Sequence, residues 1–274
     1  MRWTIGHTRW AACVLLLLLT GCGSPSSTSA GPHLRLVSEQ AISFLYDQGI
    51  AHVPGGWILS GTNLPVPDSD RLVRTDGNFH VLVRNQPAIP EVWRAEGYDH
   101  IGDIDVVDNV IYAPLEQPDY TKGYQATARF DATTLAFIDA VVLPQHQNSF
   151  VTIDPKTMIA YSMDEFDGDS LLRYDVDHGW EPLAPLKMSE VLHHTQGASI
   201  ARGDIWISTS DAHNDLYRVS LARGTVTWIG HQGHPDGEGE GLDATALSSG
   251  TIHTMIVDPS GLKVWIENFD LIGN

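Results

Sequence analysis

Residues 196–230, QGASIARGDIWISTSDAHNDLYRVSLARGTVTWIG, contain the pattern that decides the fold. Four short runs rich in β-branched, aromatic and aliphatic residues follow one another, at 198–201, 205–208, 216–219 and 226–229. Residues typical of turns separate them. Runs of this length and composition, bounded by turn residues, predict four strands joined by hairpins. Long amphipathic helical patterns are not evident elsewhere in the sequence, so we expect an all-β protein.

The same order of runs recurs along the chain. The first run of each unit can be aligned on Ile50, Ile104, Phe150, Ala198 and Leu242, and the spacings between these residues are 54, 46, 48 and 44. A period of this length is that of one four-stranded propeller blade. The fifth unit has a third run at 264–266 but no fourth, while residues 34–44 form a run that precedes the first unit.

This pattern resembles the five-bladed β-propeller architecture, over residues 34–274. We expect the ring to be closed by exchange of a strand between the termini, with residues 34–44 completing the last blade. Such closure removes the exposed sheet edges of an open array. Six blades would need units near 40 residues, and a large two-sheet β-sandwich is the alternative fold.

The N-terminus has the composition of an export signal at residues 1–21. Arg2 and Arg9 precede an apolar run at 10–19 that is too short to span a bilayer. The run ends in Leu-Thr-Gly-Cys at 19–22, which closely resembles the bacterial lipobox. That resemblance implies cleavage before Cys22 and acylation of its thiol. We therefore expect a lipoprotein anchored to the cell membrane on the extracytoplasmic face, with residues 22–33 as lipidated Cys and flexible linker.

Cysteine content and charge limit the possible partners. Cys13 lies in the predicted signal and Cys22 in the lipobox, so the mature chain has no disulfide. Removing Arg2 and Arg9 with the signal leaves 14 basic against 34 acidic residues, a formal charge of −20. That field disfavours nucleic acid and anionic lipid surfaces as partners. We expect a monomer held to the bilayer through its acyl chains.

The topology of a propeller predicts which residues surround the channel mouth. The start of each first strand should supply one member of a ring: Gln48, Asp103, Asn148 or Ser149, Gln196 and Glu240. Further polar residues should lie just outside it: His100, Asp105, His194, Glu238 and Asp243. Convergent hard oxygens suit Ca²⁺, which would also relieve repulsion between Asp103 and Glu240. We expect Asp103, Glu240, Asp105 and Asp243 as metal ligands, and Gln48, Asn148, Ser149, Gln196 and Glu238 as ligand-binding residues. The alternative is a hydrated channel with polar walls.

The predicted ring is loosely similar to that of the calcium-activated apyrases. Those enzymes are five-bladed propellers with a central Ca²⁺, but their ring uses mainly Ser and Glu, whereas Gln48 and Gln196 occupy two positions here. The basic nucleotide-binding residues of that family are not evident. The resemblance therefore implies the architecture and a central Ca²⁺, not the activity.

Two classes of function remain open from the sequence. The first is a surface-anchored module that binds a small molecule, glycan or peptide at the channel mouth. The second is a metal-dependent extracellular hydrolase or lyase, with His100 or His194 as the general base. No Gly-x-Ser-x-Gly, His-Glu-x-x-His or phosphate-loop motif is present. The loop at 230–240 is either a Gly-rich connection or a zinc site using His231 and His234 with Asp236 or Glu238.

Overall fold

The computed structural model describes residues 31–62, 68–164, 168–260 and 262–273. The predicted signal at 1–21, the lipidation residue Cys22 and most of the predicted linker lie outside these residues. Within the described part of the chain, no helix has the length and apolar composition that crossing a membrane requires.

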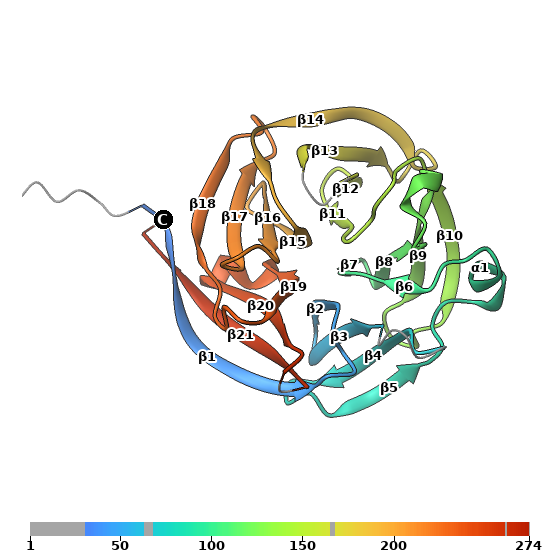
Figure 1. The fold of residues 1–274 in the computed structure, drawn as a ribbon, viewed down its shortest axis with the longest axis horizontal. Coiled ribbons are helices and arrows are strands. Elements are labelled where there is room, and N and C mark those ends of the chain that lie inside the picture. The colour runs from blue at the N-terminus through green and yellow to red at the C-terminus, as the bar shows by residue number, and fades with distance from the viewer. Residues whose placement is uncertain (1–30, 63–67, 165–167, 261, 274) are drawn as a thin grey trace, which may run out of the picture. The chain divides into compact units, whose positions relative to one another are not determined.

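Five antiparallel sheets are arranged around a central channel (Figure 1). Blade 1 contains β2 (Gly49–Val53), β3 (Gly56–Gly61), β4 (Arg71–Asp76) and β5 (Val81–Asn85). Blade 2 contains β6 (His100–Ile101), β7 (Asp105–Val107), β8 (Val110–Glu116), β9 (Gln125–Asp131) and β10 (Phe137–Leu143). Blade 3 contains β11 (Thr152–Asp154), β12 (Ile159–Ser162), β13 (Gly168–Asp175) and β14 (Glu181–Leu192). Blade 4 contains β15 (Thr195–Ala201), β16 (Asp204–Thr209), β17 (Asp215–Ser220) and β18 (Val226–His231).

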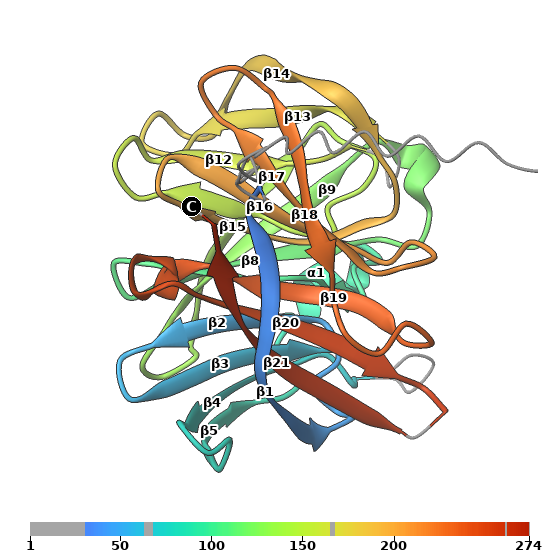
Figure 2. The ribbon, with the colours of Figure 1, turned by 90° about the vertical axis from the view of Figure 1, so that its left-hand side faces the viewer.

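Blade 5 is built from both ends of the chain. It contains β19 (Glu238–Asp243), β20 (Thr251–Asp258), β21 (Lys263–Ile272) and β1 (His33–Ser43). β1 pairs antiparallel with β21, from His33 opposite Ile272 to Ser43 opposite Lys263. Figure 2 shows β1 crossing the outside of the ring next to β21. The predicted five blades and the predicted strand exchange are both confirmed, and the six-bladed and sandwich alternatives are excluded.

In the described part of the chain, helices are short and lie in the loops that connect strands. They are α1 (Glu91–Ala95) and the 3₁₀ turns η1 (Tyr120–Lys122) and η2 (Thr245–Ser249). α1 follows β5 in the sequence and lies on the outer side of blade 2 (Figure 1). η1 lies in the loop between β8 and β9 of the same blade.

The hydrophobic core is divided among the five interfaces between neighbouring blades. Ile50 and Met255 belong to the cluster between blades 1 and 5, and Ile58 and Ile111 to the cluster between blades 1 and 2. Equivalent clusters fill the remaining three interfaces. Because the second strand of a blade is covered by neighbouring blades on both faces, β3 and β16 are buried along almost their whole length, whereas the outer strands β1 and β5 are largely exposed. Burial at the interfaces leaves the polar ends of the innermost strands to face the channel.

Candidate functional site

Asp103 lies at the centre of the ring, in the gap between β6 and β7. Its Oδ1 accepts a hydrogen bond from the N–H of Ile50 at 3.1 Å, and its Oδ2 accepts from the N–H groups of Ala198 at 3.0 Å and Leu242 at 3.2 Å. The N–H of Asp103 donates to the carbonyl of Ser149 at 2.8 Å. One residue of blade 2 therefore joins the inner segments of the other four blades. Burial raises the pKa of Asp103 well above its usual range, although the three amide hydrogen bonds oppose that shift.

Two further carboxylates connect neighbouring blades. Asp105 accepts from the N–H of Ile153 at 2.8 Å and from the hydroxyl of Thr152 at 2.9 Å. Asp243 accepts from the N–H of His52 at 2.7 Å. A carboxylate oxygen whose lone pairs accept hydrogen bonds from N–H groups has few lone pairs left to coordinate a cation. In the structure Asp103, Asp105 and Asp243 hold neighbouring blades together, and their role as metal ligands stays a prediction.

A polar cavity of about 200 Å³ opens at the channel mouth. We call its lining the channel site: Gln48, His100, Glu116, Tyr120, Ser149, Gln196, Glu238 and Glu240. These residues come from all five blades or the segments that lead into them. Four of the eight belong to the ring expected from the strand starts, namely Gln48, Ser149, Gln196 and Glu240, and His100 and Glu238 were expected just outside it. The structure brings these six side chains to one cavity, and their role in binding stays a prediction. No lining residue in the described chain is Lys or Arg.

Glu240 is a buried acid at the inner end of blade 5 that lines the channel site. Its residue surface is 6% exposed, and its carboxylate makes no hydrogen bond to any residue that the structure describes. Desolvation raises its pKa well above the usual range, and repulsion from Glu238, Asp47, Asp103 and Glu116 adds to this shift. A buried carboxylate with neither a donor nor a cation is costly. Such a group in a cavity is a marker of a functional site.

Glu116 and His100 lie directly opposite each other on β8 and β6. Burial raises the pKa of Glu116 to about 7 and lowers the pKa of His100 to about 4. Glu116 accepts from the N–H of Asn148 at 2.5 Å and from the hydroxyl of Tyr120 at 3.4 Å. Near pH 7 the cavity wall therefore carries a neutral imidazole next to a carboxyl group that exchanges its proton in the same pH range.

Two predicted site residues are not in the cavity lining. The side chain of Asn148 is fully buried, where it donates to the carbonyl of Ala126 at 2.7 Å and accepts from the hydroxyl of Ser162 at 2.9 Å. Its place in the predicted pair is taken by Ser149. His194 is exposed in the connection between β14 and β15 and is not part of the channel site. Asn148 and His194 therefore lie outside the channel site, and their predicted roles in ligand binding and as a base stay predictions.

Glu116 and Tyr120 were missed because only the first strands were used to build the ring. Glu116 is the last residue of β8, and Tyr120 is the first residue of η1 in the loop that follows. In a propeller the loop between the second and third strands lies on the same face as the starts of the first strands. A polar residue at the end of a buried apolar strand, as in Leu115-Glu116, was the available signal.

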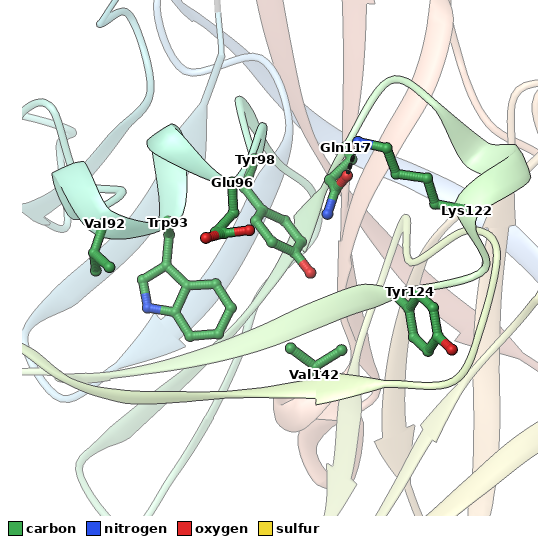
Figure 3. A pocket seen from close by; sticks show the side chains of 8 residues that line it. All are labelled: Val92, Trp93, Glu96, Tyr98, Gln117, Lys122, Tyr124 and Val142. Carbon is green, nitrogen blue, oxygen red and sulfur yellow. Dashed lines mark hydrogen bonds between the residues drawn. The ribbon is translucent and has the colours of Figure 1, made fainter.

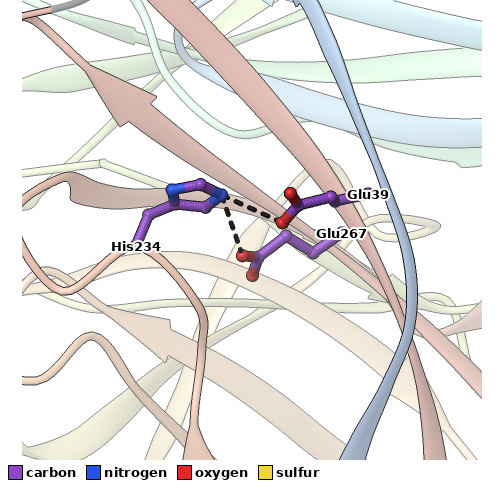
Figure 4. A group of neighbouring side chains, drawn as sticks. All are labelled: Glu39, His234 and Glu267. Atoms are coloured by element: carbon purple, nitrogen blue, oxygen red, sulfur yellow. Dashed lines mark hydrogen bonds and ion pairs between the residues drawn. The ribbon is translucent and has the colours of Figure 1, made fainter.

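A second polar cluster lies where the ring closes. Glu39 of β1, Glu267 of β21 and His234 of the loop before β19 have ligand atoms within 4.8 Å of one another, and we call them the closure site (Figure 4). This is the single such group of three His, Asp or Glu found in the described residues. His231 instead contacts Asp215 at 2.6 Å. The predicted grouping of both histidines with Asp236 or Glu238 is therefore wrong.

Another cavity lies away from the channel, beside α1. It has a volume of about 590 Å³, and Figure 3 shows Trp93 and Tyr124 on opposite sides of it, with Lys122 near its rim. Its lining is mainly apolar, and it contains none of the predicted site residues. Its volume suits a small organic ligand.

No protein-family model and no curated protein matches the sequence. Among solved structures, the chain is similar to a luciferin-regenerating enzyme, with a TM-score of 0.52 and 11% identity. The match covers 82% of this chain and 76% of that one. At this identity the likeness shows the β-propeller fold alone.

Proposed function

We propose that the protein is a lipid-anchored extracytoplasmic β-propeller that binds Ca²⁺ together with a small polar ligand at the channel site. The anchoring part rests on the Leu-Thr-Gly-Cys sequence at 19–22 and on the apolar run before it. The binding part rests on one observation, the buried carboxylate of Glu240, which faces the cavity without a hydrogen-bond partner among the described residues.

The composition of the channel site favours a cation. Glu238 and Glu240 supply carboxylate oxygens, Gln48 and Gln196 supply amide oxygens, and Ser149 supplies a hydroxyl. Ca²⁺ takes six to eight such oxygens with loose geometry, and water completes its shell where the protein does not. A bound divalent cation removes the repulsion that raises the pKa of Glu240. The volume of about 200 Å³ leaves room for a ligand smaller than a drug-sized molecule.

Thermal unfolding in the presence of Ca²⁺ tests this proposal. Ca²⁺ should stabilise the wild type by about 2.7 kcal/mol at a hundredfold excess over its dissociation constant. Glu240→Gln should lose that response, while Glu181→Gln, at an exposed position of β14, should keep it. Mg²⁺ and NaCl serve as controls for screening of the acidic surface. If all three salts raise the melting temperature alike, the channel site does not bind Ca²⁺ specifically.

A second candidate function, hydrolysis at the same site, is favoured by Glu116 and His100. A carboxyl group with a pKa of about 7 next to a neutral imidazole can donate and accept a proton near neutral pH. The similar fold of a luciferin-regenerating enzyme shows that such a scaffold can carry an enzyme, but the fold does not transfer the reaction. Hydrolysis of model esters that is lost in Glu116→Gln, with the Ca²⁺ response retained, would favour this candidate.

A further inference from the structure

The strand pair that closes the ring carries two glutamates directly opposite each other. Glu39 on β1 is paired in register with Glu267 on β21, so both side chains project from the same face of blade 5. Like charges in this arrangement destabilise an antiparallel pair. The ring depends on this pair for its closure, so a positive group between the two carboxylates would have a direct structural effect.

His234 places a nitrogen between these carboxylates. Its Nε2 lies 3.1 Å from Oε2 of Glu39 and 3.9 Å from Oε1 of Glu267, as the dashed lines in Figure 4 show. Ligand atoms bound tetrahedrally to Zn²⁺ at about 2.0–2.1 Å lie about 3.3 Å apart. The two observed distances lie on either side of that value, and all three ligand atoms lie within 4.8 Å of one another, so side-chain movement alone can bring them to one ion.

Contacts outside the cluster hold the imidazole in this orientation. The ring of His234 is stacked on Trp265, with centroids 4.5 Å apart and an interplanar angle of 12°. Its carbonyl accepts from the N–H of Gly237 at 2.8 Å and from the side chain of Asn214 at 3.3 Å. A histidine ligand oriented by its surroundings is typical of metal sites.

Glu267 provides the observation that points to a missing partner. Its side chain is fully buried, and its Oε2 accepts from the N–H of Gly233 at 3.0 Å and from the hydroxyl of Thr254 at 3.1 Å. Its Oε1, on the side of His234, has no hydrogen-bond partner among the described residues. A buried carboxylate oxygen is rarely left without a donor or a cation. One oxygen is thus anchored while the other faces the gap.

We propose that Glu39, His234 and Glu267 bind Zn²⁺ and that this ion fastens the N-terminal strand to the ring. One imidazole nitrogen and two carboxylates suit Zn²⁺, whereas Ca²⁺ takes oxygen ligands. The side chains of Glu39 and His234 are 41% and 29% exposed, so water reaches the fourth position and the ion exchanges with solvent. This site is independent of the channel site, which uses none of these residues.

Thermal unfolding of the purified protein with ZnCl₂, after treatment with EDTA, tests the closure site. Zn²⁺ should raise the melting temperature of the wild type by about 5–10 °C at a hundredfold excess over its dissociation constant. Glu39→Gln and His234→Asn should lose this increase. Hydrogen exchange of the amides in β1 should slow on addition of Zn²⁺ in the wild type and not in these variants.

Asp270→Asn is the matched control, because Asp270 pairs with Arg35 across the same two strands. It should lower the melting temperature without zinc and keep the zinc response. Glu240→Gln should also keep it, so the closure site and the channel site can fail separately. An unchanged melting temperature of the wild type, or an increase that persists in both Glu39→Gln and His234→Asn, would overturn the proposal. In either case His234 would act only as an ion-pair partner of Glu39.

Discussion

Replacing Asp103 with Ala should destabilise the ring more than any other single change at the channel. The substitution removes the acceptor of three buried N–H groups, those of Ile50, Ala198 and Leu242. Each buried donor left unsatisfied costs about 1–3 kcal/mol. Water entering the vacated space, and the loss of a desolvated carboxylate, offset part of this cost. We therefore expect a loss of about 3–5 kcal/mol, a large fraction of the total of about 5–15 kcal/mol typical of a domain.

Equilibrium unfolding in urea measures this loss. Asp103→Ala should shift the midpoint to lower urea with an unchanged slope, since the native surface is the same. Asp103→Asn keeps one carbonyl oxygen and should lose less, about 1–3 kcal/mol. Asp177→Ala, at an exposed turn between β13 and β14, should stay within about 0.5 kcal/mol of the wild type. A stability of Asp103→Ala equal to that of Asp177→Ala would refute the role of Asp103 as the residue that joins the blades.

Three further predictions follow from the channel, the closure and the anchor. Because burial lowers the pKa of His100 to about 4, protonation of His100 should oppose folding by up to about 3 kcal/mol as the pH falls from about 6.5 to 4, whereas the raised pKa of Glu116 acts in the opposite direction; urea unfolding at both pH values should therefore show His100→Gln gaining stability relative to the wild type on acidification. Deleting residues 33–45 should lower the melting temperature far more than deleting 23–32, and equal values would contradict the pairing of β1 with β21. Cys22→Ser should prevent acylation, and lipid labelling of this variant in the membrane fraction would disprove the lipobox assignment.

The blade pattern and the closing strand were predictable because their signals are local. Alternating runs and turn residues mark each strand, and a fifth unit with three strands requires a fourth from elsewhere. Propeller topology places the starts of the first strands at one end of the channel. The shared position of Gln48, Gln196 and Glu240 could therefore be predicted from the sequence.

The direction of individual side chains could not be predicted from the pattern. Asn148 and Ser149 are neighbours, yet the first is buried in hydrogen bonds and the second lines the cavity. A shift of one residue reverses the face of a strand, and the sequence does not fix that register. Asp103 was expected as one member of the ring, but its three N–H partners come from blades distant in the sequence, so its place between them could not be predicted.

The closure site could not be predicted from the sequence, because it depends on the register between two strands that are distant in the sequence. Glu39 and Glu267 meet only because β1 and β21 pair in one register, with a shift between Leu36 and Ser38. His234 was recognised as a possible ligand, but it was grouped with its neighbours along the chain. Long-range pairing, rather than motif spacing, determines which residues surround it.

The position of β1 also bears on the order in which the protein is made. Leu34 is among the first residues of the ring to leave the ribosome, and its partner Leu271 is among the last. β1 can therefore pair only after β21 has been synthesised, and pairing between segments so distant in the sequence slows folding. A translation product that stops before Lys263 has no β21, and it exposes unpaired strand edges that favour aggregation and proteolysis. Products that lack β21 cannot close the ring, so they differ from closed propellers in their exposed strand edges.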